Sequence, residues 1–427
     1  MSNRPVEAGA RRGARAGVAG AWVGLVVALF FLWGGITSLN DILIPKLKEL
    51  FQLSYAQAML TQFAFFTAYA IISLPAGALV ARLGYGRGIV LGLGTMATGC
   101  LIFIPAAASA TFGMFLAALF VLAGGVTILQ VAANPLIANL GSPQSAHSRL
   151  TFAQAFNSLG TTVAPLIGAQ VILGSIAGTD PATLSGEALR LFQAREAAVI
   201  GHIYLALAIV LAVIAMIFWL WRNRLGKGAG ATPISAGFGL LRQRRLGLGV
   251  AAIFLYVGAE VTIGSLLVNY LMQSSTLGLD QQSAGEHIAF YWGGAMLGRF
   301  VGGAVLRVLA PGKALAGAAV GALFLVSLSA LTTGQIAGWT LIAVGLANAI
   351  MFPTIFSLAI EGLGDDTPRG SGLLCMAIVG GAIVPLLAGA AADHSSLATA
   401  LAIPAACYAF IALFGASASR PVKADAS

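Results

Sequence analysis

An acid inside an apolar stretch is the first residue of this sequence that could do chemistry. Asp41 lies in the run FLWGGITSLNDILIPKLKELF, residues 31–51. The apolar segment 18–45 can cross a hydrocarbon core of about 30 Å at about 1.5 Å per helical residue. A carboxylate there costs roughly 2.5 to 3.5 kcal/mol, so a chain that keeps one normally uses it in a cavity, a proton relay or an ion site. Asp41 therefore predicts a protonation site; the alternative is an interfacial Asp that bonds free backbone near Pro45 and meets Lys46 at the surface.

Glu260 is a second acid deep within a predicted membrane span. We interpret it as a second protonation site, with a simple ion pair to an arginine as the alternative. Arg299 and Glu361 fall near the inner ends of predicted spans, where an ion pair could open and close with conformation. Both are therefore expected to act in gating.

Neutral amides form the largest group of polar side chains within the predicted spans. Gln130 and Asn134 are four residues apart and share a helix face, as do Gln154 and Asn157 at three residues apart. Two amides on one face offer donors and acceptors together, which suits a hydroxyl-rich ligand; the alternative is hydrogen bonding between helices, worth about 0.6 to 2 kcal/mol per contact. Trp292 could stack on a sugar ring, or lie at the outer membrane interface where Trp is common. The predicted substrate-binding residues are Asn40, Gln130, Asn134, Gln154, Asn157, Asn269, Trp292 and Asn348.

The composition excludes a soluble domain. Hydrophobic residues make up 59% of the 427 residues and charged residues 9%, and the mean hydropathy is +0.92. Polar side chains cannot cover a globule of this size, so the membrane must cover it. The net charge of +9 does not indicate a nucleic-acid partner, because the basic residues lie in short loops between apolar runs.

The cysteines and histidines do not indicate a metal site or an enzyme. Cys100, Cys375 and Cys407 lie in apolar runs without metal-ligand spacing and predict free, buried thiols. The four His residues are far apart, and no HExxH or GxSxG motif occurs. We expect no cofactor and no metal, and a receptor that does not transport remains an open alternative.

Counting apolar runs predicts an all-α polytopic membrane protein with twelve spans. All Lys and Arg residues except Lys46, Lys48, Arg190 and Arg195 lie on one side, which the positive-inside rule assigns to the cytoplasm together with both termini. The predicted organisation is a cytoplasmic tail 1–17, a six-helix bundle 18–221, a basic linker 222–246, a six-helix bundle 247–418 and a tail 419–427. The predicted spans are roughly 18–45, 56–81, 88–106, 111–140, 149–173, 198–221, 247–272, 284–308, 312–332, 335–361, 370–391 and 396–418.

The two halves repeat features, as in transporters built from internal repeats. GALVARLGYGRG, residues 77–88, follows the second span and LGRFVGGAVLRVLAPGK, residues 297–313, follows the eighth. A Gly-x4-Pro-Leu pattern occurs in both the fifth and the eleventh spans. Prolines within spans predict broken or bent helices at Pro135, Pro165, Pro353 and Pro385.

The chain resembles the major facilitator superfamily, and within it the L-fucose:proton symporter family that also contains bacterial glucose/galactose transporters. The resemblance is carried by SLNDILIPKLKELFQLSYAQA (38–58), supported by QFAFFTAYAIISLPAGALVARLGYGRG, QVAANPLIANLG, FAQAFNSLG, MFPTIFSLAIEGLG and GLLCMAIVGGAIVP. It implies two pseudo-symmetric six-helix bundles that rock about a central site.

The resemblance also implies roles for single residues. Asp41 matches a protonation residue, and Gln154 and Asn157 match residues on the sugar side of the cavity. Gln130 stands where the fucose transporters carry a second acid, so Asp41 acts alone, Glu260 contributes, or coupling differs. Arg82 belongs to a loop resembling the gating motif G-x-L-x-D-R-x-G, with Ala81 in place of its acid.

The predicted function is proton-coupled import of a neutral hexose in the glucose, galactose, fucose, mannose or N-acetylglucosamine range. A sodium-coupled sugar symporter and a proton-coupled drug efflux antiporter are the alternatives. The expected partners are a small neutral sugar and the lipid bilayer, with the chain acting as a monomer in the bacterial cytoplasmic membrane.

Overall fold

The computed structural model describes residues 23–39, 43, 47, 51, 55–109, 111–168, 186–222 and 236–419. Regular structure in these ranges is helical throughout. A helix satisfies its backbone hydrogen bonds internally, which the interior of a bilayer requires. Each of the twelve predicted spans corresponds to one helix or to a consecutive pair, which confirms the predicted fold class.

The first span is the helix Val23–Leu39. The N-terminal half continues with α2 (Tyr55–Leu83), α3 (Tyr85–Ser109), α4 (Phe112–Asn139), α5 (Ala146–Gly168) and α6 (Gly186–Trp221). The C-terminal half contains α7 (Ala236–Gly239), α8 (Arg244–Met272), α9 (Gln281–Val305), α10 (Pro311–Leu331), α11 (Gly334–Asn348), α12 (Met351–Ala359), α13 (Thr367–Met376), α14 (Gly380–His394), α15 (Leu397–Ala400) and α16 (Ala402–Ala418).

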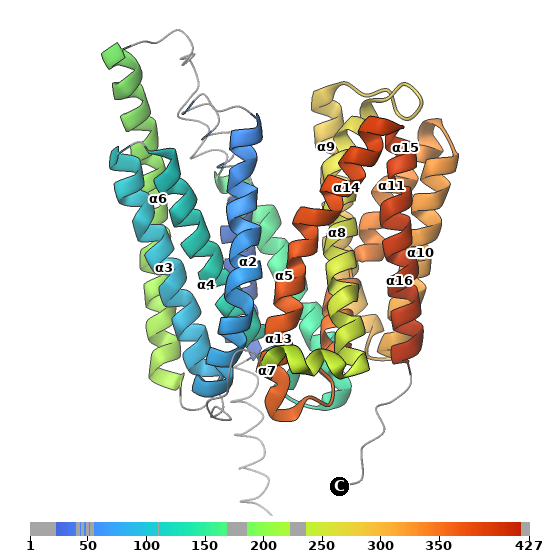
Figure 1. Ribbon diagram of the computed structural model, residues 1–427, viewed down its shortest axis with the longest axis horizontal. Coiled ribbons are helices and arrows are strands. Elements are labelled where there is room, and N and C mark those ends of the chain that lie inside the picture. Colours follow the sequence, from blue (N-terminus) through green and yellow to red (C-terminus); the bar gives the residue numbers. More distant parts are fainter. Residues whose placement is uncertain are drawn as a thin grey trace, which may run out of the picture.

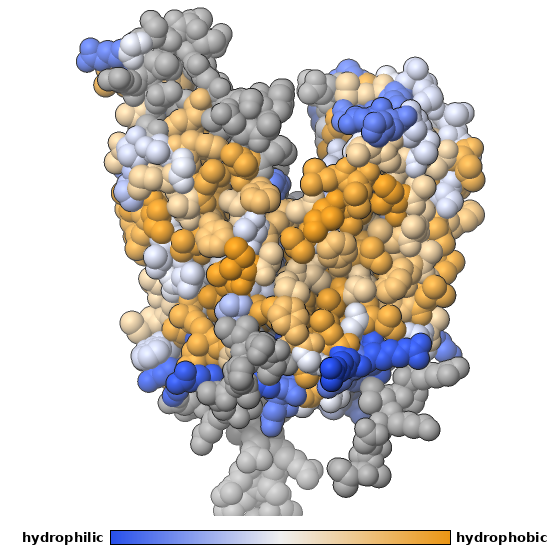
Figure 2. All heavy atoms as spheres, in the orientation of Figure 1, coloured by the Kyte–Doolittle hydropathy of each residue, from blue (hydrophilic) through white to orange (hydrophobic). Residues whose placement is uncertain are grey.

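The helices stand side by side in two groups, with α7 lying across one end (Figure 1). On the face seen in Figure 2, an apolar band crosses the middle of the molecule and hydrophilic residues gather at both ends. We call the end where α2, α4 and α6 finish the basic end, because its turns carry Arg82, Arg87, Arg149, Arg245 and Arg369. The opposite end is called the far end.

The two halves touch at the basic end. A Cβ at Gly77 of α2 would lie 3.0 Å from the carbonyl oxygen of Pro368, and a Cβ at Gly372 of α13 would lie 2.7 Å from that of Ser73. Glycine is therefore required for this backbone approach. At the far end, Figure 2 shows a notch between the halves.

Glycines spaced four residues apart, as in Gly88/Gly92, Gly294/Gly298 and Gly317/Gly321, favour close helix packing, and some of them mark such contacts. A Cβ at Gly92 would lie 2.8 Å from the backbone nitrogen of Leu129 in α4, and a Cβ at Gly298 would lie 2.5 Å from Ala349 Cβ. Gly317 and Gly321 have no neighbouring atom within 4 Å of such a Cβ, so their repeat does not mark a contact.

Several predicted boundaries differ from the structure. α6 begins at Gly186, twelve residues before the predicted start at 198, and it rises above its neighbours in Figure 1. The extra segment GEALRLFQAREA is made mostly of strong helix formers, so the helix continues past the apolar region. α8 begins at Arg244, inside the predicted linker.

Candidate functional site

Two prolines release backbone carbonyls at the contact between the halves. A helical proline cannot donate to the carbonyl four residues earlier. Pro135 thus leaves the Val131 carbonyl of α4 without this helix partner, and Ser371 Oγ of α13 donates to it at 2.9 Å. Pro353 does the same to the Ala349 carbonyl, which accepts from Arg299 Nε at 3.3 Å. The predicted disruption appears at residues 349–350, between α11 and α12, whereas α4 and α14 continue through Pro135 and Pro385.

An amide–tyrosine pair occupies the same place in each half. Gln130 Nε2 of α4 donates to the hydroxyl of Tyr69 on α2 at 2.8 Å. Asn348 Nδ2 of α11 donates to the hydroxyl of Tyr291 on α9 at 3.0 Å. Both amides stand five residues before the prolines that free the carbonyls. The weak internal repeat of the sequence therefore extends to side-chain contacts.

A largely buried acid and arginine lie between α8 and α9 of the C-terminal half. Arg299 Nη2 lies 3.6 Å from Glu260 Oε1, and 13% of each side chain is exposed. The hydroxyl of Tyr256, one turn before Glu260 on α8, donates to Glu260 Oε1 at 2.7 Å and lies 3.2 Å from the Asn348 carbonyl oxygen. Glu260 thus has a cation and a neutral donor as partners. The spacing of Tyr256 and Glu260 is the signal by which this hydrogen bond could have been predicted.

Arg299 also reaches the N-terminal half. Its Nη1 donates to Ser158 Oγ on α5, a buried residue directly after Asn157. Sequence reasoning named Arg299 but missed Ser158, whose small hydroxyl gives no signal distinct from other serines in spans. The charged pair of one half is therefore joined to the amide-bearing helix of the other.

The predicted amides of the N-terminal half lie close together. Gln154 Nε2 of α5 lies 3.4 Å from Asn134 Oδ1 of α4. Asn134 is fully buried, and its Nδ2 has no hydrogen-bond partner among the described residues. Asn157 Nδ2 donates to the Phe30 carbonyl of the first helix at 3.1 Å. The hydrogen bonds of Gln154 and Asn157 run between helices, as the alternative interpretation expects, and binding of a hydroxyl-rich ligand stays a prediction.

Trp292 lies on the face of α9 that meets α5. This face continues toward the basic end with Met296, Arg299 and Gly303, and each of these three residues contacts a residue of α5. Trp292 is 42% exposed, and its Cζ2 lies 3.1 Å from where a Cβ of Gly264 would stand. The indole therefore rests on a glycine and keeps part of its surface exposed.

The other predicted gating residues lie at the basic end. Glu361 forms an ion pair with Arg245 inside the C-terminal half, so Glu361 and Arg299 have different partners. Arg82 is exposed in the last turn of α2. A contact across the halves that sequence reasoning missed is the hydrogen bond between His147 Nδ1 of α5 and Ser357 Oγ of α12, at 2.6 Å.

Some predicted residues cannot be placed in this site. Asn40 and Asp41 lie outside the described residues. Asn269 is exposed near the far end of α8, away from the amide cluster. Among the described residues no cluster of His, Cys, Asp and Glu could hold a metal ion, and the three cysteines are free and buried.

Fold and site together define a multi-pass membrane protein of two helical halves with a polar centre between them. The family model described as Major Facilitator Superfamily matches residues 25–377. A Brucella abortus biovar 1 (strain 9-941) protein named "Glucose/galactose transporter" is 52% identical over 393 residues, 92% of each chain. The "L-fucose-proton symporter" of Escherichia coli (strain K12) is 36% identical over 408 residues, 91% of each chain.

A solved structure titled "Crystal structure of a Major Facilitator Superfamily (MFS) transporter, FucP, in the outward conformation" matches with a TM-score of 0.84 and 33% identity, covering 93% of this chain and 99% of that one. The chain belongs to the Major Facilitator Superfamily, and within it to the family of L-fucose:proton symporters and glucose/galactose transporters. This confirms the resemblance seen in the sequence and assigns the chain to transporters rather than enzymes.

Proposed function

We propose that this chain imports a neutral hexose by proton-coupled symport. The observation that carries the proposal is the neutral amide cluster of α4 and α5, joined through Ser158 and Arg299 to the carboxylate of Glu260. Amides supply donors and acceptors for sugar hydroxyls without attracting a charged substrate. The names of the relatives, a glucose/galactose transporter and an L-fucose-proton symporter, support the same substrate class and coupling ion.

The sugar enters from the notch at the far end and meets Trp292 and the amides of α5. Trp292 offers an exposed apolar face for a sugar ring, and Gln154 and Asn157 offer hydrogen bonds. The basic end faces the cytoplasm, in accord with the positive-inside rule, and both termini lie on that side. The membrane is the bacterial cytoplasmic membrane, and the chain acts as a monomer.

Asp41 and Glu260 are the protonation sites in this proposal. Binding of a proton and a sugar in the outward-open state favours rearrangement to a state open at the basic end, and their release resets the carrier. Sodium is the alternative coupling ion, because a carboxylate with nearby oxygens can also hold a cation. Gln130, being an amide, cannot itself accept a proton at this site.

Uptake into proteoliposomes tests the proposal. Radiolabelled glucose, galactose, fucose and N-acetylglucosamine are offered under a pH gradient or a sodium gradient. The proposal expects accumulation under the pH gradient, and Asp41→Asn should retain counterflow exchange but lose accumulation. Accumulation that requires sodium and does not respond to the pH gradient would show that sodium is the coupling ion instead of the proton. Absence of transport for every sugar would reject the substrate class.

A further inference from the structure

The guanidinium of Arg299 is the point at which a buried charge meets both halves. Within its own half it lies 3.6 Å from Glu260 Oε1 and donates to the Ala349 carbonyl that Pro353 frees. Across the interface it donates to Ser158 Oγ of α5. One side chain therefore contacts an acid, a backbone acceptor and the opposite half.

We propose that Arg299 is a latch that ties closure of the basic end to the charge of Glu260. This rests on the proposed proton-coupled transport and adds the residue through which the proton acts. When Glu260 is ionised, its charge balances that of Arg299 and the ion pair keeps the guanidinium beside Ser158. When Glu260 is protonated, the ion pair is lost, Arg299 leaves Ser158 and the basic end opens.

The physical reason is the cost of an unpaired buried charge. The electrostatic neighbours of Glu260 among the described residues are Arg299 and Tyr291 of α9, Tyr256 of its own helix and Tyr408 of α16. Arg299 is the cation of this group, and the tyrosines are neutral at physiological pH. Protonation of Glu260 leaves the guanidinium with the neutral acceptors Ala349 and Ser158, a strongly destabilising situation for a buried ion. Arg299 then gains by moving toward water or another anion.

Movement of Arg299 acts on the N-terminal half because of where Ser158 lies. Ser158 is fixed in α5 beside Asn157 and one turn after Gln154. Loss of its hydrogen bond separates α5 from the Arg299–Glu260 pair, while Thr162 and Ser148 of α5 still contact α9, and so weakens the α5–α9 contact. The direction suits an importer, since a proton taken up from the far end promotes opening at the basic end.

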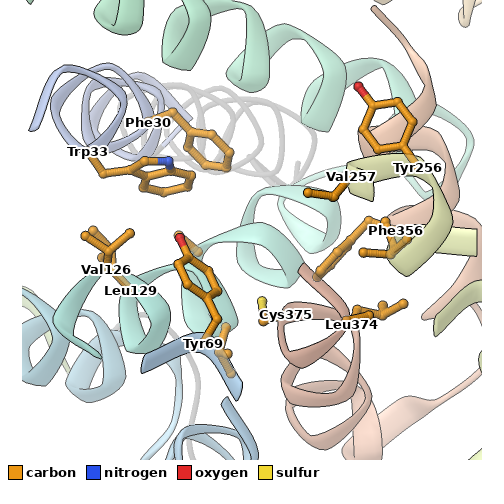
Figure 3. Packing of buried hydrophobic residues seen from close by; sticks show 14 of the residues in the cluster. Phe30, Trp33, Tyr69, Val126, Leu129, Tyr256, Val257, Phe356, Leu374 and Cys375 are labelled. Carbon is orange, nitrogen blue, oxygen red and sulfur yellow. The ribbon is translucent and has the colours of Figure 1, made fainter. Parts of the chain in front are cut away.

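A native thiol between the halves can report the opening. Cys375 is fully buried in α13, and Figure 3 shows its sulfur next to the ring of Tyr69 on α2. The background C100S/C407S removes the other two cysteines of the chain. Separation of α13 from α2 at the basic end exposes the Cys375 thiol to a maleimide.

The experiment measures the rate of maleimide labelling of Cys375 in the purified full chain across a pH series. Divided at each pH by the rate of a free small-molecule thiol, which falls with its thiolate fraction, the Cys375 rate should rise as the pH falls in the C100S/C407S background. Glu260→Gln, which mimics the protonated acid, should raise the rate at least about fivefold at neutral pH, the lower end of typical coupling between sites, and abolish its pH dependence. Asp393→Asn, at an exposed acid near the far end of α14, is the matched control and should change nothing.

Ser158 supplies a milder test if Glu260→Gln folds poorly. Ser158→Ala should raise the labelling rate of Cys375 and flatten its pH dependence. Ser158→Thr keeps the hydroxyl, so its labelling rate and pH dependence should match those of the background. The labelling rate of Arg299→Lys should lie between those of the background and Ser158→Ala, because a compact ammonium cannot reach three partners at once. Labelling of Glu260→Gln and Ser158→Ala that matches the background at every pH would overturn the latch.

Transport separates this outcome from the proposed function. Sugar accumulation with unaltered labelling in both variants rejects the latch and leaves symport standing. Labelling that responds to pH and to both variants, without transport of any sugar, supports the latch and rejects the sugar assignment.

Discussion

The hydroxyl of Ser371 donates to the carbonyl oxygen of Val131 at 2.9 Å and so joins α13 to α4 across the two halves. Ser371 is fully buried, and Pro135 leaves this carbonyl available. The bond belongs to the state that is closed at the basic end. It therefore contributes to the preference for this closed state.

Replacing Ser371 should weaken that preference. Ser371→Ala removes the donor and should cost about 1 kcal/mol, the usual net value of one hydrogen bond, seen as faster labelling of Cys375. Ser417→Ala is the control, since Ser417 donates to the Phe414 carbonyl within α16. Equal labelling of the two variants would contradict the prediction.

Gly160 should be indispensable for the position of the first helix. A Cβ at Gly160 would lie 2.1 Å from the Phe31 carbonyl oxygen. The backbone of one of the two helices would have to move to relieve this clash. Gly160→Ala should lower the midpoint of thermal unfolding in detergent, with a cost of about 1 to 3 kcal/mol typical of overpacking. Gly94→Ala in α3, where no atom lies within 4 Å, should leave the midpoint unchanged or slightly raised. A smaller effect at Gly160 than at Gly94 would refute this packing argument.

Gly264 should determine sugar affinity through Trp292. The Cβ of Gly264→Ala would stand 3.1 Å from the indole, which must shift. We expect KM for sugar uptake to rise several-fold in this variant and about tenfold or more in Trp292→Ala, with Trp292→Phe in between because it keeps an aromatic face. Trp339→Ala at the far end of α11 is the control. An unchanged KM in Trp292→Ala would remove this residue from the sugar site.

Gln130→Glu should alter coupling. The new carboxylate would replace a donor to Tyr69, whose hydroxyl can donate in return. An added protonatable group near the centre should steepen the pH dependence of uptake and raise the proton-to-sugar ratio, measured with a pH-sensitive dye in the vesicle lumen. Gln335→Glu, exposed at the start of α11, should change neither. An unaltered ratio in Gln130→Glu would show that this position is outside the proton path.

The membrane spans could be predicted because they depend on composition alone. An apolar run of sufficient length must form a helix in a bilayer whatever its neighbours are. Helix ends such as that of α6 could not be located in this way, because helix-forming residues continue beyond the apolar region. The same reasoning places α8 too late by omitting its basic first turn.

The site was only partly predictable because contacts depend on which helices become neighbours. Glu260 was singled out as an intramembrane acid, and the alternative that it pairs with an arginine matches its contact with Arg299. Ser158 and Ser371 gave no signal, since a hydroxyl in a span usually bonds its own helix. Pro353 was identified as a source of helix disruption. The donor to the Ala349 carbonyl that it frees, Arg299, could not be identified without knowing where α9 lies.

Main-chain acceptors at Val131 and Ala349 have a consequence for how this carrier tolerates change. Every amino acid carries the same carbonyl, so substitution at either position keeps the acceptor as long as the side chain fits. Proline four residues later is the true determinant of the contact, and its replacement would restore a competing donor within the helix. The contacts between α4 and α13 and between α9 and α11 therefore depend on Pro135 and Pro353, and only on the size of the side chains at Val131 and Ala349.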